Sequence, residues 1–201
     1  MRIIAGEFKG RLLEAPTGRT TRPTSARARG ALFEILGPLL EGARVADLFA
    51  GTGALGLESL SRGASTVDFY ESSRQAQAAL RKNIATLGVF PRTRVLTTPL
   101  PESLVRGPPY DIVVVDPPWR EGHELRVARR LITAQRLAPT GVLVIECPRS
   151  EPLETALWTE LGLTLDDRRN YGDTELRFYR HSANIGSADE APTASDESDP
   201  D

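Results

Sequence analysis

A glycine-rich turn between an apolar strand and a helix constrains the fold of this chain more than any other feature. Residues 45–56 read VADLFAGTGALG, and the stretch from Gly51 to Gly56 fits the pattern G-x-G-x-x-G. Glycines at such a turn let the backbone reverse tightly and let a cofactor approach it closely. The stretch therefore predicts a strand–turn–helix unit with a binding site at the turn.

Apolar runs alternate with helical patterns along the rest of the chain. Strands are predicted at 43–48, 66–71, 93–97, 111–116 and 142–147, with helices at 25–37, 54–62, 73–86, 122–136 and 152–160. A short hairpin is predicted at 2–5 and 10–14, and a closing antiparallel pair at 163–169 and 174–180. Strands that alternate with helices imply an α/β fold with a parallel, doubly wound sheet and right-handed crossovers. The first and fourth strands then flank the switch point, so the segments that follow them meet at one crevice.

Charge and composition divide the chain into three predicted parts. Residues 1–41 form a hairpin and a helix, residues 42–182 a single α/β domain, and residues 183–201 a tail. The tail holds six acids and no base, and it lacks aromatic residues, so we expect it to be disordered. Residues 1–30 hold seven bases against two acids, a net charge of +5 that suits a phosphate backbone.

Other features of the composition narrow the class of protein. There is no long apolar stretch and the first residues lack the apolar length of a signal peptide, so we expect a cytoplasmic protein without a membrane anchor. Cys147, the one cysteine, lies in an apolar run and is expected to fill the core. His123 and His181 are far apart in the sequence, and no metal site is expected.

A second motif, Asp116-Pro117-Pro118-Trp119, follows the apolar run 112–115. The prolines fix φ and remove two N–H donors, which leaves the carbonyl groups there free to face a ligand. Asp116 adds an acceptor, and Trp119 adds a face for stacking. Acceptors beside an aromatic ring suit a flat base that carries an exocyclic amine.

The charge of the glycine-rich turn distinguishes between cofactors. Asp47 would repel the pyrophosphate of a dinucleotide, whereas it would attract the ammonium group of a methionine moiety and lie near a sulfonium. Phe49 and Ala50 give the turn an apolar wall with little phosphate-binding character. Glu71 lies 20 residues after Gly51, and its carboxylate can bind ribose hydroxyls. S-adenosylmethionine therefore fits better than a nicotinamide or flavin dinucleotide.

Together these motifs resemble the class I methyltransferases that modify exocyclic amines. The N-terminal segments Arg2-Ile3-Ile4-Ala5-Gly6, Lys9-Gly10-Arg11 and Arg22-Pro23-Thr24 are similar to the RsmD family, which are bacterial small-subunit ribosomal RNA guanine-N2 methyltransferases. The resemblance covers residues 2–181. It implies a seven-stranded Rossmann-like sheet, S-adenosylmethionine as cofactor, and 16S ribosomal RNA, within a small-subunit particle, as substrate. We expect the enzyme to act as a monomer.

The resemblance also implies roles for individual residues. The catalytic motif, which would hold the N2 amine of guanine and stack on its base, comprises Asp116, Pro117, Pro118 and Trp119. The expected cofactor-binding residues are Asp47, Ala50, Gly51, Thr52, Gly53, Glu71, Ser72, Leu100 and Asp116. The residues expected to hold RNA phosphates are Lys9, Arg11, Arg22, Arg27 and Arg29.

The chain departs from the family pattern at four positions. Trp119 stands where Tyr or Phe is common, Pro99 replaces a polar residue near the adenine, and Ala26 and Gly30 stand where an acid pair is common.

Three other functions also fit part of the sequence. An adenine-N6 methyltransferase acting on DNA or RNA would use the same strand end. A non-catalytic ribosome assembly factor would keep the fold, but the motif acids and glycines are intact. The basic N-terminal segment disfavours a small-molecule methyltransferase.

Overall fold

Seven strands form one sheet of order β3-β2-β1-β4-β5-β7-β6 in the computed structural model, which describes residues 1–15, 26–118 and 122–184. The strands are β1 (Arg44–Leu48), β2 (Thr66–Tyr70), β3 (Thr93–Leu96), β4 (Tyr110–Val115), β5 (Leu137–Pro148), β6 (Leu163–Tyr171) and β7 (Thr174–His181). The helices are α1 (Ala26–Leu40), α2 (Ala54–Ser61), α3 (Arg74–Leu87), α4 (His123–Thr133) and α5 (Thr155–Glu160). Short 3-10 turns span Phe90–Arg92 and Ser182–Asn184.

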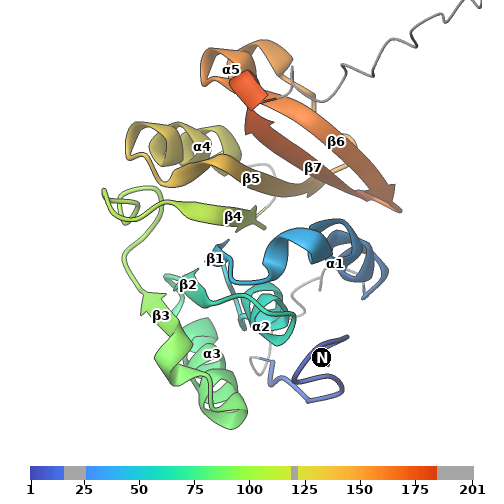
Figure 1. Cartoon of the computed structure of the whole chain (residues 1–201), viewed down its shortest axis with the longest axis vertical. Helices are drawn as coiled ribbons and strands as arrows, with labels where there is room; N and C mark the ends of the chain where they lie inside the picture. The colour runs from blue at the N-terminus through green and yellow to red at the C-terminus, as the bar shows by residue number, and fades with distance from the viewer. Residues whose placement is uncertain (16–25, 119–121, 185–201) are drawn as a thin grey trace, which may run out of the picture.

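The doubly wound sheet predicted from the sequence is confirmed. Strands β1 to β5 are parallel, and β6 and β7 form the predicted antiparallel pair. Strand β7 also pairs antiparallel with β5. The strand order can be followed in Figure 1 from β3 at one end of the sheet to β6 at the other. Strand β1 lies between β2 and β4, so the strand order reverses at β1 and β4.

Several element boundaries differ from the predictions for local reasons. Helix α1 continues to Leu40, although Pro38 lies inside it, because Leu36 and Leu40 are both fully buried in the core. Helix α4 ends at Thr133 rather than 136, since Gln135 has a φ of 54° that an α-helix does not accommodate. Strand β5 begins at Leu137, which pairs with Tyr110 before a register shift.

The N-terminal hairpin, residues 1–15, is a turn with little regular strand structure. One antiparallel bridge joins Arg2 to Leu12. Hydrogen bonds from the Ile3 amide to the Arg11 carbonyl at 3.0 Å and from the Gly10 amide to the Ile3 carbonyl at 2.9 Å close it. The predicted pairing of its two arms is therefore present over a shorter length than expected.

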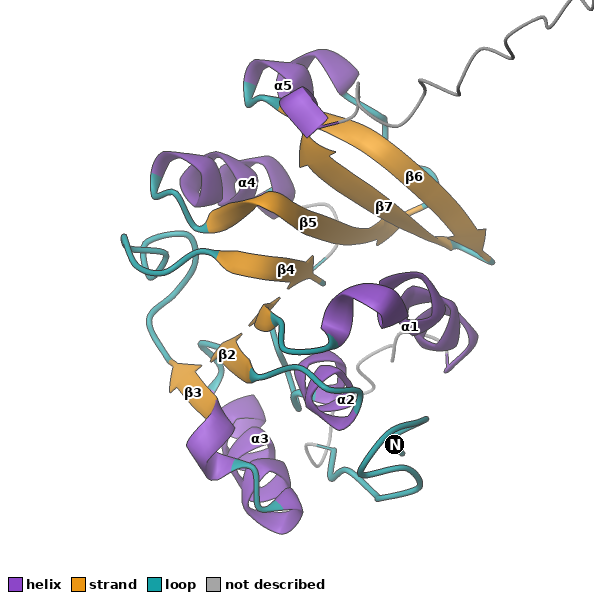
Figure 2. Ribbon diagram, viewed as in Figure 1, coloured by secondary structure: helices purple, strands orange, loops and turns teal. Residues whose placement is uncertain are grey.

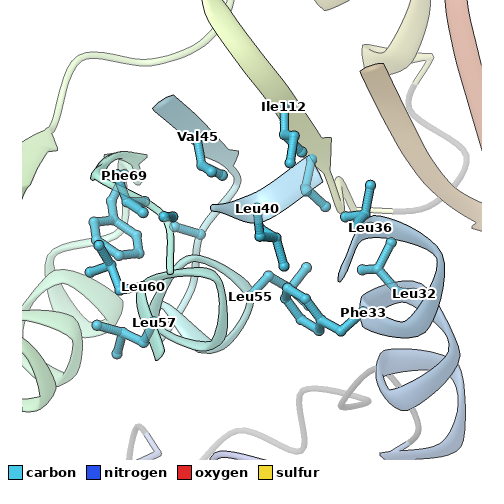
Figure 3. Close-up of a cluster of buried hydrophobic side chains, with 14 of the residues drawn as sticks. Leu32, Phe33, Leu36, Leu40, Val45, Leu55, Leu57, Leu60, Phe69 and Ile112 are labelled. Atoms are coloured by element: carbon cyan, nitrogen blue, oxygen red, sulfur yellow. The ribbon is translucent and has the colours of Figure 1, made fainter. Parts of the chain in front are cut away.

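Helices cover both faces of the sheet (Figure 2). On one face α1, α2 and α3 pack on alternate residues of the strands, and on the other face α4 and α5 do so. Figure 3 shows part of the first cluster, in which these side chains meet: Leu32, Phe33, Leu36, Leu40, Val45, Leu55, Leu57, Leu60, Phe69 and Ile112. The N-terminal hairpin joins the same cluster through Ile3 and Leu13.

Two further expectations concern single features of the chain. Cys147 is buried in β5, as predicted for a core residue, and burial raises the pKa of its thiol to about 12. Within residues 1–15, 26–118 and 122–184, no helix has the length and apolar character needed to cross a membrane. Most of the predicted acidic tail lies outside the described residues.

Candidate functional site

The glycine-rich turn after β1 has the conformation that its glycines predicted. Phe49, Gly51 and Gly53 have φ values of 64°, 56° and 81°. A Cβ on Gly53 would lie 2.3 Å from Cδ1 of Leu80, so only glycine fits there without displacement. A Cβ on Gly51, in contrast, would meet no atom within 4 Å. The side of the turn at Gly53 is thus closely packed against the core. The side at Gly51 is open, so a ligand could approach the backbone there.

Asp47 supports this turn from inside the protein. Its side chain is 2% exposed, and Oδ2 accepts a hydrogen bond from the Gly56 amide at 2.8 Å. Burial raises the pKa of Asp47 to about 8; the Gly56 hydrogen bond opposes this shift, and the neighbouring Asp116 and Glu71 carboxylates add to it. A cation bound at the turn would favour the ionised form. The placement suits an electrostatic role for Asp47 towards a positively charged ligand.

Glu71 links the end of β2 to the turn. Its Oε2 accepts from the Gly51 amide at 2.8 Å and its Oε1 from the Ser73 amide at 2.7 Å. Each carboxylate oxygen has a second lone pair, so both can still accept from hydroxyl groups of a ligand. The sequence predicted Glu71 only as a ribose-binding acid, and its direct contact with the Gly51 amide is a finding of the structure.

A hollow lies beside the turn at the carboxyl edge of the sheet. Its lining comprises Phe49, Tyr70, Glu71, Ser72, Thr98 and Leu100. Three of these residues were predicted from the sequence, namely Glu71, Ser72 and Leu100. Phe49 and Leu100 provide apolar surface next to a carboxylate, a combination that suits contact with part of a nucleoside, although the hollow, at about 30 Å³, is too small to enclose one. A second hollow, lined by Leu39, Glu41, Gly42, Ala43, Asp111, Thr140 and Val142, lies at the amino edge and contains none of the motif residues. Because ligands of open α/β sheets bind at the carboxyl edge, we place the site beside the turn.

The Asp-Pro-Pro motif ends β4 next to the turn. Leu48 of β1 pairs with Val115 of β4, and the Asp116 amide donates to the Leu48 carbonyl at 3.3 Å. Asp116 is half-buried, Pro117 is buried and Pro118 is exposed. The fourth residue of the motif, Trp119, lies outside the described residues. The structure thus brings together the two motifs that are about 65 residues apart in the sequence.

Two residues of this region were missed by sequence reasoning as site residues. The ring of His123, the first residue of α4, lies 5.3 Å from the Phe49 ring, centroid to centroid. Phe49 lines the hollow, and His123 contacts Phe49 without lining the hollow itself. The closeness of His123 to the Asp-Pro-Pro motif was the available signal. Phe49 was read only as an apolar wall of the turn.

The basic residues of the N-terminal region are placed in different ways. Lys9, Arg11 and Arg27 are exposed, as phosphate contacts require, and Arg22 lies outside the described residues. The expectation that Arg29 holds an RNA phosphate is wrong, because Arg29 is 4% exposed and its Nη2 donates to the Arg2 carbonyl at 2.8 Å. Burial lowers the pKa of Arg29, an effect that the Glu58 carboxylate opposes. Arg29 therefore fastens the N-terminal hairpin to α1 and does not face a nucleic acid.

Comparison with known proteins places the chain in a family. A family model described as conserved hypothetical protein 95 matches residues 1–180. The chain is 35% identical over 185 residues to the ribosomal RNA small subunit methyltransferase D of Escherichia coli (strain K12), covering 91% of each. It is 32% identical over 185 residues to the putative rRNA methyltransferase YlbH of Bacillus subtilis (strain 168), covering 90% of this chain and 98% of that one.

A solved structure agrees with the sequence relatives. The putative methyltransferase yhhF from Escherichia coli has a TM-score of 0.78 and 34% identity, covering 90% of this chain and 97% of that one. The resemblance stated from the sequence motifs is thus supported over nearly the whole chain by both sequence and fold. The chain belongs to the RsmD family, the family whose model is described as conserved hypothetical protein 95.

Proposed function

We propose that this protein transfers a methyl group from S-adenosylmethionine to the exocyclic N2 amine of a guanine in 16S ribosomal RNA. The observation that carries the proposal is the contact between the two motifs, in which the Asp116 amide donates to the carbonyl of Leu48, the last residue before the glycine-rich turn. A base held at Asp116 would lie beside a cofactor held at the turn. The names of the relatives in Escherichia coli and Bacillus subtilis support ribosomal RNA as the substrate class.

The residues at the turn fit S-adenosylmethionine. Glu71 would accept the ribose hydroxyls, and the open space above Gly51 leaves room for the cofactor. Phe49 and Leu100 would contact the adenine in the hollow that they line. The buried Asp47 would provide negative charge near the methionine end. When bound, the cofactor supplies an electrophilic methyl group on sulfur.

Asp116 and Pro117 would prepare the guanine amine for attack. The lone pair of N2 is delocalised into the ring, which makes the nitrogen a poor nucleophile. If the Asp116 carboxylate and the Pro117 carbonyl each accept one amine hydrogen, the nitrogen can pyramidalise towards the methyl group. The Asp116 carboxylate would also receive the proton that N2 loses on methylation, but because carboxylates are weak bases at neutral pH, we assign Asp116 mainly to positioning. Correct positioning contributes up to about 7–11 kcal/mol in well-oriented reactions.

The RNA would be held by the exposed part of the basic N-terminal region. Lys9 and Arg11 are exposed on the N-terminal hairpin, and Arg27 is exposed at the start of α1. We propose residues 1–41 as the RNA-binding extension of a methyltransferase domain at 42–182. We propose a small-subunit particle as the substrate, since a catalytic domain at 42–182 has little surface for reading a long RNA sequence. We also propose that the enzyme acts as a monomer.

The test is methyl transfer from labelled S-adenosylmethionine to small-subunit particles from cells that lack this enzyme. Nucleoside analysis of the product should find N2-methylguanosine. Finding N6-methyladenosine instead would leave the assignment of the active site intact but show that the target base is adenine and not guanine. Binding to particles without transfer to particles, naked RNA or DNA would favour a non-catalytic assembly factor.

A further inference from the structure

The side chain of Asn83 joins the N-terminal hairpin to the glycine-rich turn. Asn83 lies in α3 and is 1% exposed. Its Nδ2 donates to the Thr52 carbonyl at 3.0 Å and to the Glu14 carbonyl at 3.1 Å. Its Oδ1 accepts from the Glu14 amide at 2.8 Å. Both donors and one acceptor of the amide are thus bonded to two segments that are distant in the sequence.

A second set of hydrogen bonds fixes the hairpin to α2, the helix that follows the turn. The Glu58 carboxylate accepts from the Ile4 amide at 2.7 Å and from the Ala5 amide at 3.0 Å. The Glu7 amide donates to the Ser61 carbonyl at 2.7 Å. The hairpin therefore contacts α2 at one end, and through Asn83 it is connected to the turn at the other end.

Thr52 is the central residue of the turn and lies between two glycines. Glycine has more accessible backbone conformations than other residues, so Gly51 and Gly53 leave the turn with little conformational preference of its own. Asn83 restrains the carbonyl of Thr52 in the folded protein. A turn that is already held in its binding conformation loses less conformational entropy when a ligand binds.

We infer that Asn83 is a positioning residue for the cofactor, and that the N-terminal hairpin is a structural part of the cofactor site as well as a candidate RNA contact. The inference rests on the proposed function, because it assumes that S-adenosylmethionine binds at the turn. Its consequence is that weakening the contact between Asn83 and the hairpin lowers cofactor affinity even when no RNA is present.

The experiment measures the Kd for S-adenosylmethionine by titration calorimetry, without RNA, for the wild type, three variants that test the inference and one control variant. Asn83→Ala removes all three hydrogen bonds and should raise Kd by about 2- to 10-fold, the value of one net hydrogen bond at the turn. Glu14→Pro removes the Glu14 amide donor together with the carboxylate side chain, and should raise Kd less than Asn83→Ala does. Glu14→Ala keeps the backbone bonds and removes an exposed ion pair with Lys82, so it should match the wild type.

Two readouts separate positioning from a general loss of stability. Thermal unfolding identifies variants that are folded at the titration temperature. Turnover on small-subunit particles should show a raised KM for S-adenosylmethionine with kcat largely retained, which a merely destabilised protein would not produce. Asn170→Ala, at an exposed position in β6, is the control for an Asn-to-Ala change.

Each outcome decides one question. A folded Asn83→Ala variant with the wild-type Kd overturns the inference but leaves the proposed function intact. A wild-type protein that does not bind S-adenosylmethionine overturns the proposed function instead. If Asn83→Ala does not fold, Glu14→Pro decides, and a wild-type Kd in that variant overturns the inference.

Discussion

Replacing Asp47 by Asn should remove a large part of the pH dependence of stability. Burial raises the pKa of Asp47 from 3.8 to about 8 in the folded protein. Between these values the folded state binds a proton that the unfolded state does not bind. The stability contributed by the protonated group is therefore lost as pH rises towards 8. Integrating this proton linkage from pH 6 to pH 9 gives a loss of about 3 kcal/mol in the free energy of unfolding for a group that titrates near 8.

Asn has nearly the same shape as a protonated Asp and does not titrate. Its side-chain oxygen can still accept the hydrogen bond from the Gly56 amide. Urea unfolding at pH 6 and at pH 9 should show that the wild type loses about 3 kcal/mol more than Asp47→Asn. Titrating groups that do not interact with Asp47 contribute equally to both proteins and cancel in the difference. An equal loss in both proteins would refute the assignment of a raised pKa to Asp47.

The same argument predicts how cofactor binding depends on pH. A bound sulfonium and ammonium would favour the ionised form of Asp47 and lower its pKa. The affinity of the wild type for S-adenosylmethionine should therefore rise between pH 6 and pH 8, because less energy is then needed to ionise the carboxylate. Asp47→Asn should lack this rise, and its remaining pH dependence should reflect only the titration of the ammonium group of the cofactor. Titration calorimetry at three pH values measures both.

The other predictions concern catalysis, RNA binding and the turn. Asp116→Ala should abolish methyl transfer and change the Kd for S-adenosylmethionine by less than about 10-fold, the effect of about one hydrogen bond; near wild-type turnover would contradict the mechanism. Arg27→Glu should weaken RNA binding and reduce the slope of log K against log salt by about 1, and an unchanged slope would remove Arg27 from the interface. Arg29→Gln should leave that slope unchanged and lower the free energy of unfolding in urea by about 1–3 kcal/mol, because the hydrogen bond from the buried Arg29 to the Arg2 carbonyl is lost. Gly53→Ala should cost about 1–3 kcal/mol, since its φ is 81° and its Cβ would lie 2.3 Å from Leu80; wild-type stability would refute the close packing.

Local patterns explain what could be predicted along the chain. The strand, turn and helix around Gly51 and Gly53 follow from glycine spacing and apolar runs, which act over a few residues. The Asp-Pro-Pro motif follows a strand for the same reason. Boundaries were less predictable: α1 passes Pro38 because core burial of Leu40 outweighs the missing N–H donor.

The partners of polar side chains could not be predicted in the same way. Arg29 belongs to a basic segment, yet it is buried against the Arg2 carbonyl, because α1 packs on the hairpin. Asn83 lies in an amphipathic helix and has no motif around it, although it bonds both Glu14 and Thr52. Contacts of this kind depend on which segments meet in space.

The sequence by itself determined the order of the strands and helices along the chain, the glycine-rich turn, the acid at the end of the second strand and the family. These features depend on residue types at short spacing, where backbone geometry and burial leave few alternatives. Only the tertiary structure decided that Asp47 is buried with a raised pKa, that Arg29 binds the N-terminal hairpin and not RNA, and that Asn83 connects the hairpin to the turn. Burial and hydrogen-bond partners arise from packing between distant segments, and a single sequence does not encode that packing in a local pattern.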